Sequence, residues 1–275
     1  MFKFAAIQMA SGPNVAGNLN EVDRLISQAA DLGANLVVLP ENFAFMGMQE
    51  SDVLSIAEQP DEGPIQDFLR ERARQHQIWI VGGTLPLVAD TQHVFASCLT
   101  FNAAGELAAR YDKHHLFDVS IDESEETYKE SDTIAPGSQH TWLDSPFGRI
   151  GFSVCYDIRF PELYRQWLET PVDVIVVPSA FTATTGKAHW EPLIRARAIE
   201  NLCYVVAPNQ GGYHVNGRET YGDSMIVSPW GEVLDRLARG SGVVIADIDL
   251  DNQHRLRQTF PVLQHRRINI GNANE

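Results

Sequence analysis

The stretch Leu36-Val37-Val38-Leu39-Pro40-Glu41 decides the fold, because Val174-Ile175-Val176-Val177-Pro178-Ser179 repeats its pattern in the second half of the 275-residue chain. Each stretch is a short apolar run, rich in β-branched residues, that a proline stops, which predicts a buried strand. Glu41 and Ser179 therefore follow equivalent strands, directly after the carboxyl end of each. The repetition predicts a protein built from two similar halves.

Around the first stretch, the order of apolar and turn-forming residues predicts an α/β half. The predicted strands are residues 3–8, 36–39, 78–81, 94–101 and 107–111. The predicted helices are residues 18–32 and 65–75. Residues 113–137 are acidic and polar and are predicted to form a loop. The first half thus opens as strand, helix and strand and closes with a hairpin.

The second half repeats this order, and residues 227–234 resemble the hairpin residues 101–108. The predicted strands are residues 149–154, 174–177, 203–207 and 243–247, and the predicted helices are residues 161–169 and 190–201. We expect one pseudo-symmetric α/β domain over residues 1–268, followed by a polar tail at 269–275. Each mixed sheet would carry helices on one face and pack against the other sheet with its second face.

Charge and hydropathy limit the partners of this protein. A formal charge of -15 and a pI near 4.9 disfavour nucleic acid and anionic membranes, which bind basic faces. Gln8 interrupts the N-terminus before a signal-peptide apolar region forms, and no apolar run approaches the roughly 20 residues of a membrane span. We expect a soluble cytoplasmic protein. Its three cysteines form no C-x-x-C pair, so neither a disulfide framework nor a zinc ribbon is indicated.

Cys155 is the candidate nucleophile. It lies between the strand-like residues 149–154 and a helix start at Pro161-Glu162, the position of a side chain held at a strand-to-turn elbow. The alternative is a buried structural cysteine, which is also the reading we adopt for Cys98 and Cys203. Because ligands gather at the carboxyl ends of parallel strands, Cys155 and Glu41 are predicted to share one cavity mouth.

A cysteine nucleophile needs a neighbouring base or positive charge. The histidines, among them His114-His115, His189 and His265, lie in no cysteine-protease signature and suit surface or structural positions. Glu41 is the better candidate base, because partial burial would raise its pKa, although it could equally be a solvated loop carboxylate. A lysine at position 113 is ordinarily a surface charge, unless it lies beside a carbonyl oxygen that becomes an anion.

Taken together, these segments resemble the nitrilase superfamily of carbon-nitrogen hydrolases over about residues 3–267. Its Glu-Lys-Cys triad matches Leu39-Pro40-Glu41-Asn42, Tyr111-Asp112-Lys113 and Val154-Cys155-Tyr156-Asp157, in the same order. Further matches are Tyr128-Lys129-Glu130-Ser131, Pro178-Ser179-Ala180-Phe181, Ala188-His189-Trp190-Glu191 and Tyr221-Gly222-Asp223-Ser224. Such an ordered set is far more specific than any one motif.

The resemblance implies a four-layer αββα sandwich, commonly extended by dimerisation through its helices, and no metal or organic cofactor. It also implies roles: Glu41 as base, Lys113 and the backbone N–H of Tyr156 as oxyanion donors, and Glu130 as a group that orients Lys113 or the substrate. The alternative for Glu130 is one carboxylate in an acidic loop. Family position suggests these substrate contacts: Asn42, Phe43, Tyr156, Arg159, Phe181 and Thr182. Arg159 could instead pair with Asp157 or Glu162.

Within the superfamily the chain most resembles amidases that act on deaminated glutathione, through residues 155–162 and Phe260-Pro261-Val262-Leu263-Gln264-His265-Arg266-Arg267. The expected activity is hydrolysis of the primary amide of a small carboxylated substrate to acid and ammonia through a thioester. ω-Amidases, which act on α-ketoglutaramate, share much of this framework. Two other classes stay open: a catalytically silent scaffold and a redox-sensing thiol, although the latter lacks an evident resolving cysteine.

Overall fold

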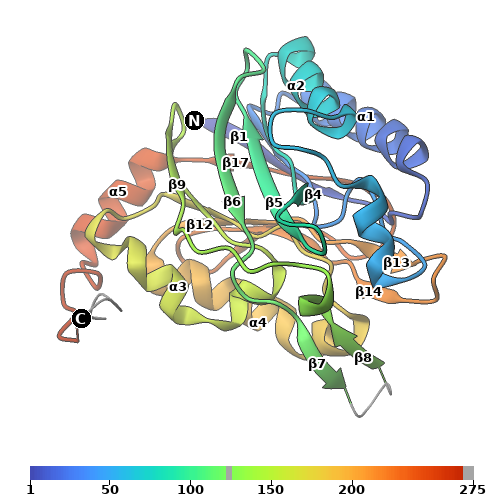
Figure 1. The fold of residues 1–275 in the computed structure, drawn as a ribbon. Helices are drawn as coiled ribbons and strands as arrows, with labels where there is room; N and C mark the ends of the chain where they lie inside the picture. The colour runs from blue at the N-terminus through green and yellow to red at the C-terminus, as the bar shows by residue number, and fades with distance from the viewer. Residues whose placement is uncertain (122–125, 269–275) are drawn as a thin grey trace.

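Two large sheets stack face to face, and helices cover the outer face of each (Figure 1). The structure, a computed structural model, describes residues 1–121 and 126–268. The tail expected at residues 269–275 lies outside the described residues. The layers run helix, sheet, sheet, helix, which confirms the predicted αββα sandwich.

The first sheet has the strand order β17-β1-β2-β3-β5-β4, and β6 pairs with β5. These strands are β1 (Phe2–Gln8), β2 (Leu36–Val38), β3 (Trp79–Val81), β4 (Leu85–Val88), β5 (Val94–Phe101), β6 (Leu107–Asp112) and β17 (Gly242–Ile248). Strands β1, β2 and β3 are parallel, whereas β17 runs antiparallel to β1. The carboxyl ends of the three parallel strands therefore meet at one edge.

Alternating side chains of β1 explain why this sheet lies between two apolar layers. Phe4 and Ala6 are fully buried in the core shared with the second sheet, whereas Ala5 and Ile7 are buried against the helical layer. This is the period of two expected of a strand whose two faces are both covered. The helices on this side are α1 (Val15–Asp31) and α2 (Pro64–His76).

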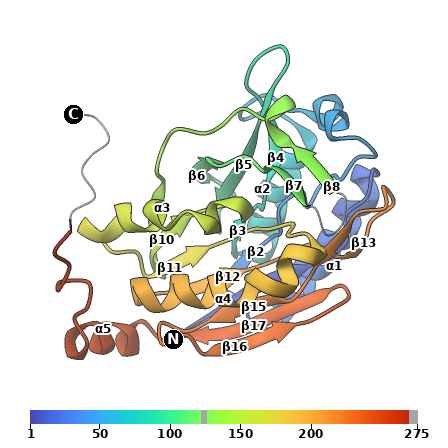
Figure 2. The ribbon, with the colours of Figure 1, turned by 90° about the horizontal axis from the view of Figure 1, so that it is seen from below.

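The second sheet has the order β16-β15-β12-β11-β10-β9. Its strands are β9 (Trp142–Ser145), β10 (Gly148–Phe152), β11 (Val174–Val176), β12 (Tyr204–Ala207), β15 (Ser224–Val227) and β16 (Val233–Leu237). Its helices are α3 (Pro161–Arg165) and α4 (Ala183–Asn201), of which α4 crosses β12 and β15 (Figure 2). Helix α5 (Leu250–Thr259) follows β17.

Several elements differ from the sequence prediction, among them helix α3, which ends at Arg165 rather than at residue 169. The segment predicted as a loop at 113–137 contains a hairpin of β7 (Asp118–Ile121) and β8 (Glu126–Lys129). Helix α4 begins at Ala183 rather than at Trp190, because Thr182 caps it by accepting a hydrogen bond from the N–H of Thr185. The β-branched residues and glycine of this first turn are weak helix formers and concealed it.

Strand β17 joins the first sheet although it belongs to the second half of the chain. The last strand thereby ties the two sheets together, and β17 also contacts β15 and β16. Within the described part of the chain, no helix is both long and apolar enough to span a membrane.

Candidate active site

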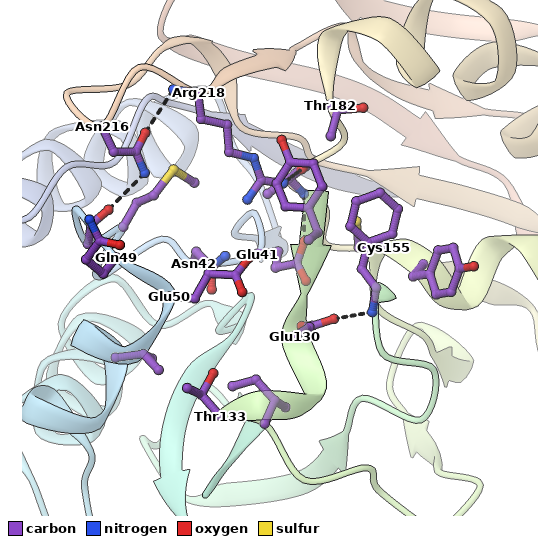
Figure 3. A pocket seen from close by; sticks show the side chains of 18 of the residues that line it. Glu41, Asn42, Gln49, Glu50, Glu130, Thr133, Cys155, Thr182, Asn216 and Arg218 are labelled. Carbon is purple, nitrogen blue, oxygen red and sulfur yellow. Dashed lines mark hydrogen bonds between the residues drawn. The ribbon is translucent and has the colours of Figure 1, made fainter. Parts of the chain in front are cut away.

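The carboxyl ends of strands from both sheets open into one cavity of about 660 Å³. Glu41 follows β2, Lys113 follows β6, and Cys155 follows β10, and all three line this cavity, as does Glu130. Figure 3 shows Glu41, Glu130 and Cys155 around it. The structure thus brings together four side chains that are far apart in the sequence. Their shared position agrees with the expectation that Glu41 and Cys155 occupy one mouth.

Cys155 stands at a strained elbow. Its φ of 46° lies in the left-handed region, which a residue with a Cβ atom rarely adopts. The backbone N–H of Cys155 donates to the carbonyl of Pro178, 2.9 Å away, at the end of the neighbouring strand β11. The strain and this contact fix the thiol at the cavity wall, with 8% of the residue exposed.

Asp157 holds the turn that follows the nucleophile. Its fully buried carboxylate accepts hydrogen bonds from the N–H of Val154 at 2.8 Å, the hydroxyl of Tyr111 at 2.7 Å and the N–H of His115 at 3.0 Å. Tyr111 and His115 lie on either side of Lys113 in the sequence. One carboxylate therefore fixes the nucleophile's turn relative to the segment that carries the lysine.

Lys113 lies between two carboxylates. Its Nζ is 2.7 Å from Oε1 of Glu41 and 2.8 and 2.9 Å from the two oxygens of Glu130. Only 2% of the Lys113 side chain is exposed, against 6% for Glu41 and 19% for Glu130. Ordinary surface roles for Lys113 and Glu130 are thereby excluded, because a buried charge is retained only with partners of this kind.

The second oxygen of Glu41 is also held. Its Oε2 accepts a hydrogen bond of 2.8 Å from the N–H of Ala180, and its backbone carbonyl accepts one of 2.9 Å from Nε2 of Gln210. Glu41 is therefore fixed by groups from both sheets. Each carboxylate oxygen retains a further lone pair, so these contacts leave Glu41 able to accept a proton.

Burial and charge act in opposite directions on these groups. Burial lowers the pKa of Lys113, but the carboxylates of Glu130 and Glu41 more than offset this and raise it well above its usual value. Burial, and secondarily the negative charge of Glu41, raises the pKa of the Cys155 thiol, which Lys113 opposes. Burial also raises the pKa of Glu130. Near neutral pH the lysine is thus protonated and the resting cysteine is a thiol, which needs a base.

Replacing Glu41 with glutamine is expected to make the thiol of Cys155 more acidic while lowering the rate of amide turnover. The change keeps the size of the side chain but removes its negative charge, so the pKa of Cys155 should fall, and the pH profile of its alkylation by iodoacetamide should move to lower pH. Amide turnover should meanwhile fall by roughly 10²–10⁴-fold through loss of the base. Mass spectrometry of each cysteine as a function of pH measures the first effect.

Cys98 and Cys203 provide internal references, since both are fully buried and burial raises the pKa of each, that of Cys203 to about 12. The matched control is Glu50→Gln, which removes an exposed carboxylate from the same cavity. An alkylation profile of Glu41→Gln that stays in place or moves to higher pH would contradict the electrostatic account.

Five of the expected substrate contacts line the cavity: Asn42, Tyr156, Arg159, Phe181 and Thr182. Phe43 does not, because its fully buried side chain packs into the core between the first sheet and its helices. The expectation that Phe43 contacts substrate is therefore wrong for its side chain. Adjacent residues at a strand end point in different directions, and Asn42, with a φ of 58°, turns toward the cavity while Phe43 turns away.

Arg159 pairs with neither Asp157 nor Glu162. Its guanidinium lies over the ring of Phe181, 5.1 Å from the centroid, and Nη1 is 3.1 Å from Nδ1 of His189. Burial lowers its pKa. A cation in aromatic surroundings remains available to an anionic substrate group.

The sequence did not reveal several cavity residues, namely Gln49, Glu50, Thr133, Asn216 and Arg218 (Figure 3). Tyr128 lines the cavity as well. Asn216 and Arg218 lie on the connection between β13 (Gly211–Tyr213) and β14 (Glu219–Tyr221), a short hairpin that was not predicted. The segment Asn216-Gly217-Arg218 contains Asn-Gly, a turn signal that could have indicated this hairpin. No local pattern indicates which cavity the turn faces.

Cys98 and Cys203 lie in the core, as expected. Across residues 1–121 and 126–268, no cluster of three or more His, Cys, Asp or Glu side chains is arranged to hold a metal ion.

A family model described as carbon-nitrogen hydrolase matches residues 3–258. The chain belongs to the carbon-nitrogen hydrolase family. This membership confirms the resemblance, and the match includes both halves of the sandwich and every candidate catalytic residue.

Relatives of this carbon-nitrogen hydrolase carry a narrower name. The deaminated glutathione amidase of Synechocystis sp. is 43% identical over 271 residues, which cover 95% of this chain and 97% of the relative. That of Yersinia enterocolitica is 40% identical, covering 96% of this chain and 92% of the relative. The crystal structure of the C. elegans NitFhit protein matches with a TM-score of 0.89 and 38% identity, over 97% of this chain and 65% of that chain.

Proposed function

We propose that this carbon-nitrogen hydrolase is a cysteine-dependent amidase that acts through a thioester on Cys155. The observation that carries the proposal is the buried ion chain Glu130–Lys113–Glu41 beside a strained cysteine in one cavity. Intact charges of this kind are costly to bury, which argues against a catalytically silent scaffold. A redox-sensing thiol would need a resolving cysteine, whereas Cys98 and Cys203 are enclosed in the core.

In the proposed mechanism Glu41 takes the proton of Cys155 as sulfur attacks the amide carbonyl. Glu41 then returns the proton to the departing nitrogen, and the carbon–nitrogen bond breaks. The amine or ammonia departs, and the acyl group stays on Cys155 as a thioester. Lys113 and the backbone N–H of Tyr156 stabilise the oxyanion, a contribution of about 3–4 kcal/mol per donor in comparable sites. Glu130 orients Lys113. Glu41 finally activates the water that releases the acid.

Deaminated glutathione is the substrate that we propose first. The names of the relatives support it, as do Arg159 and Arg218, two cavity cations suited to a substrate with carboxylates. Glutathione is a tripeptide without a primary amide, so cleavage of its deaminated form would release a peptide amine. The ammonia expected from the sequence would instead accompany an ω-amidase acting on α-ketoglutaramate, which is the second candidate.

The two candidates are separated by their leaving groups. Purified protein is assayed for cysteinylglycine release from deaminated glutathione and for ammonia release from α-ketoglutaramate, simple amides, nitriles and N-carbamoyl compounds. We expect the highest kcat/KM for deaminated glutathione. A higher kcat/KM for α-ketoglutaramate would assign ω-amidase activity, and folded protein that hydrolyses no amide would refute the amidase proposal.

Assembly and location remain predictions. We infer one domain over residues 1–268, supported by a family match that includes both halves. We also propose a homodimer or higher homo-oligomer formed through the outer helices, and a cytoplasmic location. The proposed partner is a small-molecule amide, with no nucleic acid or membrane. Sedimentation equilibrium of the purified protein tests the oligomeric state.

A further inference from the structure

Two arginines in the cavity have no carboxylate partner among the residues that the structure describes. In the described part of the chain, neither Arg159 nor Arg218 forms an ion pair, whereas Lys113 is held by two carboxylates. Arg159 belongs to the turn Cys155–Arg159 and therefore lies on the same short segment as the nucleophile. Arg218 enters from the β13–β14 hairpin of the second half (Figure 3). The cavity thus presents cations from two separate elements.

The hairpin that carries Arg218 is anchored to the rest of the protein. Nδ2 of Asn216 donates to the carbonyl of Gly47 at 2.8 Å. The buried ring of His214 is 2.8 Å from the carbonyl of Ser11 through Nδ1 and 2.8 Å from Oγ1 of Thr220 through Nε2. These contacts fix the base of Arg218 before any ligand binds. A positioned guanidinium loses little conformational freedom on binding, which favours a recognition role.

The guanidinium itself is only partly satisfied. Nη2 of Arg218 donates to the carbonyl of Ala180 at 2.8 Å, and its Cζ lies 4.9 Å from the ring centroid of Tyr128. Nε is buried and has no hydrogen-bond partner among the described residues. The other terminal nitrogen of Arg218, Nη1, donates to no described residue and is left for a ligand, and a planar guanidinium pairs well with a carboxylate.

We propose that Arg218 determines substrate specificity by binding the carboxylate on the leaving-group arm of the substrate. This rests on the proposed action on deaminated glutathione, which carries one carboxylate on its acyl arm and another on its departing glycine. The shorter acyl arm stays bonded to Cys155, so its carboxylate binds Arg159, which lies on the same turn as the nucleophile. The longer departing arm reaches toward the β13–β14 hairpin and Arg218.

The test compares deaminated glutathione with an analogue whose glycine carboxylate is capped as an N-methylamide. Wild-type protein should prefer the free carboxylate by about 10- to 100-fold in kcat/KM, chiefly through KM. Arg218→Gln should remove the preference for the free carboxylate, because the variant should lose activity on deaminated glutathione and keep its activity on the N-methylamide analogue. Its activity on α-ketoglutaramate, which lacks the leaving-group arm, should stay within about twofold. Such a residue-by-substituent cycle isolates the contact from general damage to the fold.

Arg239→Gln is the matched control, because it removes the same charge from an exposed residue outside the cavity. Arg218→Lys should restore only part of the preference, since an ammonium lacks the planar fork. Equal loss by Arg218→Gln on both forms of the substrate, or a preference that survives the substitution, would overturn the inference alone. Wild-type protein that cleaves neither form would overturn the proposed substrate together with it.

Discussion

Replacing Cys155 with serine is expected to lower amide turnover by about 10⁴-fold or more, because loss of a nucleophile removes the covalent route. Burial already raises the pKa of the Cys155 thiol, and a serine hydroxyl at the same place is a far weaker acid still. A carboxylate such as Glu41 cannot activate it effectively. Initial rates on deaminated glutathione and α-ketoglutaramate measure the effect.

Trapping the thioester intermediate tests whether the sulfur of Cys155 is the nucleophile. Intact mass spectrometry of wild-type protein quenched in acid during turnover should show an acyl adduct, and digestion should place it on Cys155. The serine variant should keep the circular dichroism spectrum but show no adduct. The matched control is Cys98→Ala, which changes a core thiol and should retain turnover. Full turnover by Cys155→Ser, or an adduct on another cysteine, would refute the thioester mechanism.

Replacing Lys113 with methionine is expected to damage both activity and stability. Without the ammonium, Glu41 and Glu130 face one another as unpaired buried carboxylates, which should cost about 3–5 kcal/mol of unfolding free energy. Loss of the oxyanion donor should separately lower kcat by about 10²–10³-fold. Urea unfolding and steady-state kinetics measure the two effects.

The pH dependence of this stability loss follows from the pKa shifts. Since the folded-state pKa of Lys113 is raised, its contribution is fully present below the unfolded value of about 10.4 and is lost only as pH rises through the higher folded value. The deficit of Lys113→Met should therefore be large at pH 7.5. It should shrink toward pH 5, because burial raises the pKa of Glu130 and so lets this carboxylate protonate.

The matched control is Lys129→Met, which removes an exposed ammonium whose partner Asp132 is exposed too. Its unfolding free energy should change by less than about 1 kcal/mol. The double variant Lys113→Met with Glu130→Gln should regain part of the stability but not the activity. A Lys113→Met protein with the same deficit at both pH values would show that the charge interaction is not what stabilises this site.

The sequence placed Glu41 and Cys155 at strand ends for a physical reason. Both follow short apolar runs, so local patterns sufficed to place each at the carboxyl edge of its own sheet, and the stacking of the two sheets brings these edges together. The family resemblance supplied Lys113 and Glu130. Their burial was not predictable, because it depends on contacts between groups that lie 17 and 72 residues apart in the chain.

Features set by long-range packing were missed. The adjacent residues Asn42 and Phe43 face the cavity and the core respectively, a difference that depends on the left-handed backbone of Asn42. The hairpin of Arg218 is anchored to the N-terminal part of the chain through Asn216 and His214. Hydrophobic periodicity carries no information about such contacts, since they lie outside regular strands and helices.

The pairing of β17 with β1 has a consequence for how the protein is made. Strand β1 is made long before its antiparallel neighbour β17, which ends at Ile248, so this edge of β1 stays unpaired until β17 has left the ribosome. The hydrogen bonds that hold Glu41 likewise need Ala180 and Gln210, which are made much later than Glu41 itself. The contacts of Glu41 and the paired edge of β1 therefore form only after the second half of the domain has been made. Until then the unpaired edge of β1 is a template for pairing with another chain, which favours aggregation of the incomplete protein.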